Sequence, residues 1–211
     1  MDKKALFEEF TKHLLEDDIP SKYFNKDEHK KIFSKIYPFT MLGDLVKTEQ
    51  NLKHHPEGNV WNHTMLVVDM AAKVKHKSKD PKVFMWAALL HDLGKAHTTR
   101  VKNNRIIAYG HDEAGENLAV NFFKEFDLEE DFIYKVSKLV RWHMQCMFVV
   151  KKLPFRDVSK MLKETDLDDI ALLTYCDRLG RANMSNEKIK QEIQNVDKFV
   201  EEMKHINNNI R

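Results

Sequence analysis

The sequence predicts an all-α protein, and three observations lead to this expectation. Apolar residues recur with the spacing of one helix face along most of the chain, as at Leu6, Phe10 and Leu14. Glycine and proline are scarce, with 6 Gly and 5 Pro in 211 residues, although a β-sandwich needs many turns. Only residues 96–109 do not fit a helix. We therefore expect one helical bundle with short connections and a short hairpin near residues 98–108.

The N-terminal elements follow from periodicity and from helix start and stop signals. A first amphipathic helix is predicted over residues 3–16. Asn25 and Glu28 have the spacing of a capping box for a second helix, which Pro38 must end. After a loop, a third helix is predicted over about residues 60–77.

The next predicted helix is the most hydrophobic part of the chain. Asp80 is a good N-cap and Pro81 suits the first helical position. The run VFMWAALL, residues 83–90, is apolar throughout. Gly94 is expected to stop this helix.

The C-terminal half continues the helical pattern after one interruption. β-branched residues on both sides of Asn103-Asn104 favour the short hairpin. Asp166 is expected to cap a helix that reaches Gly180. The other helices are predicted over residues 111–126, 129–144 and 186–207.

Composition excludes several classes of protein. A formal net charge of +2 gives no general case for binding nucleic acid or membranes. No apolar run approaches the ~20 residues that span a bilayer, and the first ten residues carry acids where a signal peptide needs an apolar stretch. Cys146 and Cys176 form no CxxC pair, which favours a reducing compartment. We expect a cytoplasmic protein with no membrane partner.

Polar residues with metal-binding chemistry lie at the ends of the predicted helices. The apolar run ends in His91 and Asp92, with Lys95 close behind. Side chains at a helix end can turn toward one ion, although adjacent residues inside a helix point about 100° apart. Similar positions are held by His63, His111, His143 and Asp177. Each could instead be a cap or an ion pair, as Asp177 could be with Arg181 one turn later.

The ordered set of motifs resembles the HD-domain metal-dependent phosphohydrolases. The nearest likeness is the HD domain that follows the catalytic head in bacterial tRNA nucleotidyltransferases and poly(A) polymerases. The matching stretches are HPEGNVWNHT (55–64), AALLHDLGKAHTT (87–99), YGHDEAGENLA (109–119), LVRWHM (139–144) and YCDRLGR (175–181). The likeness implies a single domain over residues 1–211, with an HD core at about 40–182 and helical extensions at 1–39 and 183–211.

The resemblance also implies a metal centre. One divalent ion would be held by His63, His91, Asp92 and Asp177, and a second by His111 and His143 with Asp92 bridging. Imidazole and carboxylate suit Mn, Fe, Co, Ni or Zn, and Mg is also considered. Asp92 and Lys95 would be the catalytic residues. The side chains expected to contact the substrate phosphate are Lys95, Arg178 and Arg181.

The expected reaction is hydrolysis of a small phosphate ester by a metal-activated hydroxide. A nucleoside monophosphate or a 2′,3′-cyclic phosphate is the expected substrate. Nucleotide addition is not predicted, because none of the six glycines precedes serine as in the transferase head. The Gly-Tyr-Pro motif of cyclic-di-GMP phosphodiesterases is absent, and Leu93-Gly94-Lys95 replaces the acidic pair of ppGpp hydrolases.

Two other functions remain open at this point. Some members of the same superfamily resemble this ligand order yet bind two irons and activate oxygen. Alternatively, the chain could be a non-catalytic module with a structural metal, in which the lysines of residues 73–82 contact RNA. His54 and His55 are interpreted as structural or rim residues. His97 could shuttle a proton, although nothing in the sequence requires it, and no role is assigned to Asp112. The oligomeric state stays open.

Overall fold

The computed structural model describes the backbone of residues 2–210 and the side chains of residues 2–29 and 31–206. It is predominantly helical, with one small two-stranded sheet, so the predicted all-α class is confirmed. The elements in chain order are α1 (Lys3–Glu16), α2 (Ser21–Phe24), α3 (Asp27–Lys35), α4 (Thr40–Lys47), α5 (Val60–Val74), η1 (Lys75–Lys77), α6 (Pro81–Leu90), α7 (Lys95–Thr98), β1 (Arg100–Lys102), β2 (Arg105–Ile107), α8 (His111–Phe123), α9 (Glu130–Trp142), α10 (Gln145–Val150), α11 (Val158–Glu164), α12 (Leu167–Leu179) and α13 (Asn186–Ile210).

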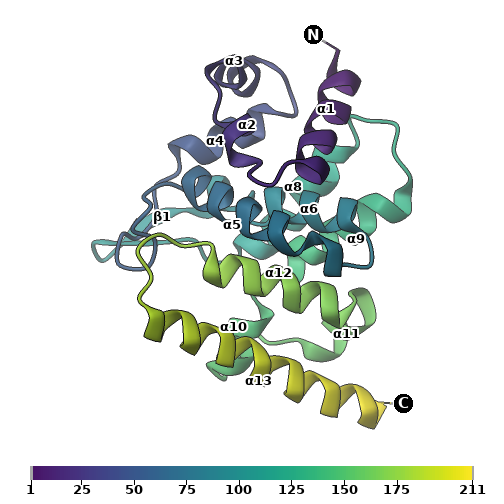
Figure 1. The fold of residues 1–211 in the computed structure, drawn as a ribbon. Helices are drawn as coiled ribbons and strands as arrows, with labels where there is room; N and C mark the ends of the chain where they lie inside the picture. The colour runs from purple at the N-terminus through teal and green to yellow at the C-terminus, as the bar shows by residue number, and fades with distance from the viewer. Residues whose placement is uncertain (1, 211) are drawn as a thin grey trace.

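The central helix of the bundle is α6, which packs against α1, α5, α9 and α12 (Figure 1). Every residue from Val83 to Leu90 is buried, as expected for a helix that is apolar on all sides. Asp80 accepts hydrogen bonds from the backbone N–H groups of Lys82 and Val83, and Pro81 occupies the first turn. The polar residues that follow Leu90 therefore begin deep inside the protein.

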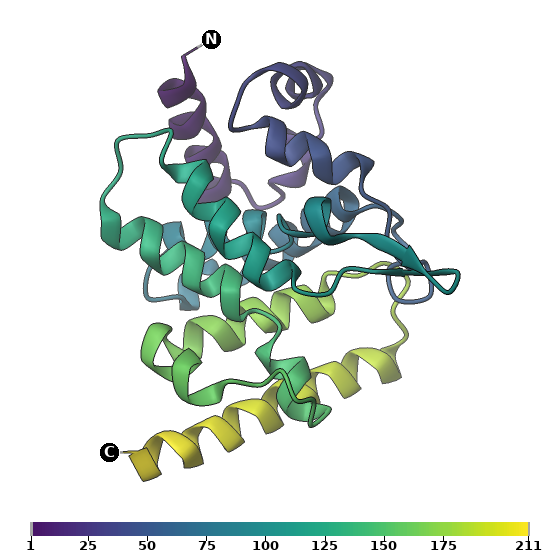
Figure 2. The ribbon, with the colours of Figure 1, turned by 180° about the vertical axis from the view of Figure 1, so that it is seen from behind.

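The other helices surround α6 on several sides. Figure 1 shows α1–α4 at the N-terminal end of the molecule and α12 followed by α13 at the opposite end. Seen from behind, α8 and α9 run side by side over the back of the bundle (Figure 2). Phe10 of α1 contacts the rings of Phe24 and Phe39, and Phe199 of α13 is buried, so both ends of the chain join the hydrophobic core.

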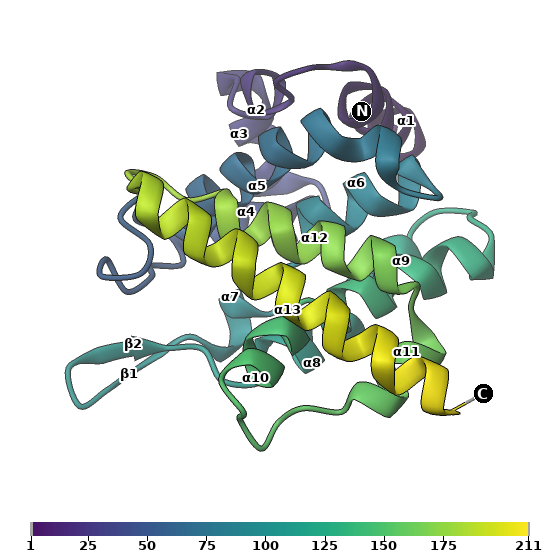
Figure 3. The ribbon, with the colours of Figure 1, turned by 60° about the horizontal axis from the view of Figure 1, so that its bottom comes forward.

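The predicted hairpin is confirmed and projects from the helical body (Figure 3). β1 pairs antiparallel with β2, and Lys102 faces Arg105 across the turn. Asn103 and Asn104 both have positive φ, of 49° and 56°, which is the backbone of the tight turn that suits the twist of a hairpin. Among residues 2–210, no helix has both the length and the apolar composition needed to cross a bilayer.

The second helix does not begin as predicted. Asn25 caps nothing with its side chain, because its Oδ1 accepts a hydrogen bond of 2.8 Å from the indole N–H of Trp61. α3 starts at Asp27 without a side-chain cap. The short helices α4, α10 and α11 were not expected, and residues 95–98 form the helical turn α7 inside a segment predicted to be non-helical.

Gly94 has a different role from the predicted helix stop. α6 ends at Leu90, and Gly94 has φ −65°, an ordinary right-handed conformation. A Cβ at this position would lie 2.0 Å from the backbone oxygen of His111 and 2.6 Å from the backbone nitrogen of Gly115. Gly94 thus lets the turn after α6 pack directly on the first turns of α8.

Replacing Gly94 by alanine should destabilise the protein by about 1–3 kcal/mol or more, because backbone atoms must move to admit the methyl group. The free energy of unfolding from urea titration followed by circular dichroism measures this. The control is Lys12→Ala, an exposed position on α1 where alanine suits the helix. Equal stability of Gly94→Ala and wild type would contradict the close packing.

Candidate metal centre

The six predicted ligands come from separate elements and converge on one buried place. His91 and Asp92 directly follow α6, and His143 directly follows α9. His63 lies in the first turn of α5, His111 is the first residue of α8, and Asp177 is in the last turn of α12. All six are buried, with exposed fractions between 0% for His63 and His91 and 7% for His111.

Asp92 lies in the middle of the group, between two pairs of imidazoles. Its Oδ2 is 3.3 Å from Nε2 of His91 and 3.8 Å from Nε2 of His63. Its Oδ1 is 3.5 Å from Nε2 of His111 and 3.8 Å from Nε2 of His143. Each pair with Asp92 has its donor atoms within 4.8 Å of one another, close enough to share an ion. One carboxylate therefore faces two potential metal positions.

The four imidazoles are oriented in the same way. Nδ1 of His91, His111 and His143 donates to the backbone carbonyl three residues earlier, at 2.9, 2.7 and 2.6 Å respectively. Nδ1 of His63 lies 3.0 Å from a carboxylate oxygen of Glu57. The bonds to backbone carbonyls fix the tautomer of His91, His111 and His143 and leave the lone pair of each of these Nε2 atoms directed at the centre, as in metal-ligating histidines.

The Nε2 atoms that face the centre lack hydrogen-bond donors for their lone pairs among the described residues. Nε2 of His91 is buried and has no hydrogen-bond partner in the part of the chain that the structure describes. Nε2 of His111 is 3.3 Å from Nε2 of His143, although both rings already donate through Nδ1. Two lone pairs facing each other in a buried place are unfavourable unless a cation lies between them. The donor set therefore fits divalent metal ions.

The pKa values of the histidines also favour a metal ion in the centre. Burial, with the neighbouring imidazoles of His111 and His91, lowers the pKa of His143 to about 4, so this ring is neutral at pH 7 and can bind a metal. Burial also lowers the pKa of His111. For His91, burial opposes a positive charge, but Asp92 outweighs it and raises the pKa. A cation beside Nε2 of His91 is thus favoured.

Asp177 joins the group through His63. Its Oδ1 lies 3.0 Å from Nε2 of His63. The guanidinium groups of Arg178 and Arg181 each come within 3.9 Å of its carboxylate. Burial alone would raise the pKa of Asp177, but His63 and the two arginines hold it well below its usual range. The carboxylate is therefore charged and available as a ligand.

Lys95 contacts Asp92 directly. Its Nζ is 2.6 Å from Oδ2 of Asp92 and 2.7 Å from Oε1 of Gln50, and 12% of its side chain is exposed. Burial would raise the pKa of Asp92, but the charge of Lys95 and the contact with His91 lower it well below its usual range. Lys95 is thus a fixed cation at the edge of the centre, and Gln50 is a partner that the sequence did not reveal.

Glu57 is the main site residue that the sequence analysis missed. Its side chain is only 3% exposed, and one oxygen lies 3.0 Å from Nδ1 of both His63 and His55. Burial would raise the pKa of Glu57, but these two histidines lower it. His55, Glu57 and His63 also form a group close enough to hold an ion. The sequence HPEGNVWNH, residues 55–63, did contain a clue, because it places the acidic residue Glu57 in the loop just before the helix that carries His63.

Removing the carboxylate of Glu57 should weaken metal binding. In Glu57→Ala, His63 loses the acceptor that holds its ring, so we expect metal affinity to fall about 10–100-fold. Competition of Mn²⁺ or Zn²⁺ against a chromophoric chelator measures the dissociation constant. The control is Glu125→Ala, whose carboxylate pairs with Lys3 at the surface. Unchanged affinity in Glu57→Ala would show that Glu57 does not position a ligand.

The remaining sequence candidates lie outside this group. Asp112 pairs with Arg141 at 2.5 Å, which gives it a structural role. His97 is exposed on α7. His54 borders a cavity near the end of α12, as do Arg178 and Arg181. Both cysteines are buried and free.

Comparison with known proteins agrees with the geometry. The family model described as HD domain matches residues 60–179. Similar curated proteins are Multifunctional CCA proteins. One from Actinobacillus pleuropneumoniae is 27% identical over 182 residues, which cover 82% of this chain and 43% of that protein. One from Methylobacillus flagellatus is 30% identical over 163 residues, covering 77% and 37%.

A third Multifunctional CCA protein, from Methylococcus capsulatus, is 30% identical over 145 residues, which cover 68% of this chain and 32% of that protein. The chain thus spans less than half the length of these relatives. The resemblance to the HD domain of tRNA nucleotidyltransferases is confirmed. The matched residues 60–179 include the segments that carry His63, His91, Asp92 and Asp177. Because this match covers more than half of the chain, the chain belongs to the HD domain family.

Proposed function

We propose that this protein is a metal-dependent phosphohydrolase that cleaves a small phosphate ester of a nucleotide. The observation that carries the proposal is the arrangement around Asp92. Two pairs of imidazoles face its two oxygens through Nε2, and Lys95 contacts the same carboxylate from the rim. This set offers ligands for a pair of divalent ions beside a fixed cation, which suits phosphoryl chemistry.

The ligands are assigned as the sequence predicts. His63, His91, Asp92 and Asp177 would hold one ion, and His111 and His143, with Asp92 shared, would hold the other. When bound, such ions lower the pKa of a coordinated water toward 7 and so supply hydroxide at neutral pH. Mn, Fe, Co, Ni, Mg and Zn are the candidate ions, since all of them accept oxygen or imidazole ligands.

The protein's own side chains would do the rest. The backbone carbonyls behind His91, His111 and His143 keep these rings in one orientation, so no reorganisation is needed when substrate arrives. The ammonium of Lys95 has three N–H donors, of which Asp92 and Gln50 take two, so the third is free for a phosphate oxygen at the partly exposed edge of the centre. There it would stabilise negative charge that develops on the phosphate.

The substrate class rests on chemistry and on likeness. Arginine and lysine near the centre suit a phosphate group, because guanidinium binds phosphate through paired hydrogen bonds. The relatives are named Multifunctional CCA proteins, which is consistent with a nucleotide or the end of an RNA. A nucleoside monophosphate or 2′,3′-cyclic phosphate is therefore the proposed substrate.

Turnover by metal-loaded protein tests this function. The protein is stripped with chelator, reloaded with Mn²⁺, Ni²⁺ or Co²⁺, and assayed with bis-(4-nitrophenyl) phosphate and a panel of nucleotides. We expect release of nitrophenolate, and either nucleoside and inorganic phosphate from a nucleoside monophosphate or nucleoside monophosphate from a 2′,3′-cyclic phosphate, with no product from the stripped protein. Absence of turnover with every metal would contradict the proposal. Substrate-dependent oxygen uptake by iron-loaded protein would point instead to the oxygenase chemistry of the superfamily.

The lysine-rich segment of residues 73–82 gives little support to a separate RNA-binding function. Nζ of Lys75 donates to the backbone oxygens of Leu14 and Asp17, at 3.3 and 3.1 Å. Lys79 pairs with Asp166, and the Nζ of Lys82 lies over two phenylalanine rings. These lysines join the N-terminal helix and the start of α12 to the bundle, which explains them without a nucleic acid.

A further inference from the structure

A cavity of about 500 Å³ lies beside the metal centre and is not used by the proposed reaction. It is bordered by the loop before α5, the end of α12, α10 and the first turns of α13. We call this cavity the cationic pocket, because five cationic side chains line it: Lys53, Lys151, Arg178, Arg181 and Lys188. Figure 3 shows α10 and α13 next to each other on this side of the molecule.

Arg178 borders this cavity with unused hydrogen-bonding capacity. Its side chain is 10% exposed, and its nearest charged partner is Oδ2 of Asp177 at 3.9 Å, too far for a hydrogen bond. Within the described residues the guanidinium of Arg178 makes no hydrogen bond to protein. The Nε of Arg181 is likewise buried without a partner. A buried guanidinium donor that stays unpaired, as Nε of Arg181 does, is costly, and the Arg178 guanidinium beside it has donors free for a ligand, so the arrangement favours an anion.

The balance of charge in the cavity is strongly positive. Its acidic side chain, Glu192, is already occupied by Lys188 at 2.7 Å and by Asn195 at 3.2 Å. The pKa of His54 is consistent with this positive charge, because burial and then the charges of Lys53 and Arg181 lower it. An anionic group would therefore meet several cations there and few competing carboxylates.

The size and the apolar wall match a nucleotide. Pockets for small molecules have volumes of about 300–1,000 Å³, and this cavity lies within that range. Met147, Val150 and Met184 line it beside the cations. Thioether and aliphatic side chains pack well against the flat face of a base or a sugar ring.

We propose that the cationic pocket binds a second phosphate group of the substrate, one that does not react. The inference rests on the proposed function, which places the reacting phosphate at the metal centre. Arg178 and Arg181 contact Asp177 and also border the cavity, so the two sites share a wall. The favoured substrates are therefore nucleotides with phosphate groups on both sides of the ribose, or short oligonucleotides.

The first test is binding to the metal-free full chain, which needs no turnover. Calorimetric titration compares adenosine 5′-monophosphate with adenosine. We expect the monophosphate to bind at least about tenfold more tightly, since only its phosphate group can make charge-assisted hydrogen bonds to the cationic pocket. The double variant Lys53→Ala/Lys151→Ala should clearly reduce this difference, since it removes two of the five cations of the cationic pocket. Both lysines are exposed, and an unchanged thermal midpoint would show that the fold is kept.

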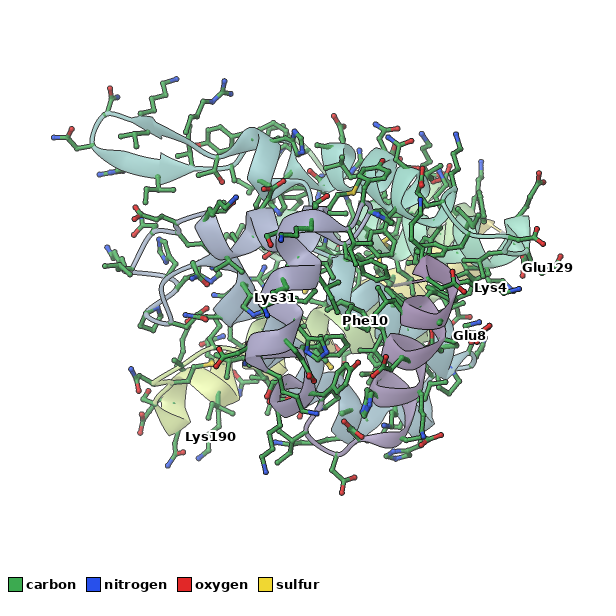
Figure 4. The ribbon with its side chains drawn as sticks, turned by 90° about the horizontal axis from the view of Figure 1, so that it is seen from above. Lys4, Glu8, Phe10, Lys31, Glu129 and Lys190 are labelled. Carbon is green, nitrogen blue, oxygen red and sulfur yellow. The ribbon has the colours of Figure 1, made fainter. Side chains whose placement is uncertain are left out.

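The control is Lys4→Ala/Lys31→Ala, which removes the same charge from the other end of the molecule. Both residues lie on the N-terminal helices α1 and α3 (Figure 4). This variant should bind like wild type. Equal binding of monophosphate and adenosine by wild type, or equal losses in both double variants, would overturn the proposal.

The second test uses metal-loaded protein and separates this proposal from the proposed function. The kcat/KM for adenosine 3′,5′-bisphosphate should exceed that for adenosine 5′-monophosphate at least about tenfold, and the ratio should fall toward one in Lys53→Ala/Lys151→Ala. If no nucleotide is hydrolysed but the binding difference holds, the proposed function fails and the phosphate site stands. If turnover occurs with no preference for the bisphosphate, the phosphate site is wrong.

Discussion

Replacing Asp92 by asparagine is expected to lower phosphoester turnover by about 10³-fold or more, because the loss combines two ligand bonds with several kcal/mol of charge stabilisation. Asp92 faces both imidazole pairs and Lys95, so it belongs to each potential metal position. The amide keeps the shape and one oxygen but removes the negative charge that holds the cations. Steady-state kcat with bis-(4-nitrophenyl) phosphate and the metal bound per chain measure the effect.

Asp112→Asn is the matched control. Asp112 is also a buried aspartate, with 6% exposure, and its partner Arg141 lies outside the centre. It should keep its bound metal and most of its turnover even if its stability falls. If Asp92→Asn behaves like this control, with metal and turnover close to wild type, then Asp92 is not a shared ligand.

Replacing Lys95 by methionine is expected to lower kcat about 10²–10³-fold, the usual cost of removing one group that stabilises transition-state charge. The metal content should stay near that of wild type, since Lys95 contacts Asp92 but offers no ligand. This separation of turnover from metal content distinguishes Lys95 from the ligand residues. Kinetics and metal analysis on the same preparation test it.

The control for this variant is Lys102→Met, on the exposed strand β1. It should leave kcat for bis-(4-nitrophenyl) phosphate unchanged. Loss of metal together with turnover in Lys95→Met would assign Lys95 a structural role in the centre. Unchanged kcat would show that its ammonium does not reach the reacting phosphate.

The candidate centre was predictable because its residues occupy helix ends next to apolar segments. His91 and Asp92 end an entirely buried helix, and burial of such groups calls for a compensating partner. His111 is the first residue of α8, and His143 directly follows α9. The hydrophobic periodicity of the sequence predicted both helices close to their observed positions. Local sequence therefore predicted these side chains as candidate ligands together with the elements that position them.

The residues that were missed depend on contacts distant in sequence. Glu57 lies in a loop where Gly58 has φ +96°, and periodicity says nothing about such a loop. Asn25, which was predicted to be an N-cap, instead accepts a hydrogen bond from the indole of Trp61, 36 residues away in sequence. The short helices α4, α10 and α11 are too short to be stable alone, so packing decides them rather than local pattern.

The most direct test of the proposed two-metal centre is the number of metal ions in the protein as purified without chelator and after saturation with Mn²⁺. Mass spectrometry of the metals, with protein concentration from amino-acid analysis, gives ions per chain. We expect two ions per wild-type chain and a clear loss of metal in Asp92→Asn. One ion or none in wild type, or the same content in both proteins, would contradict a two-metal centre built around Asp92.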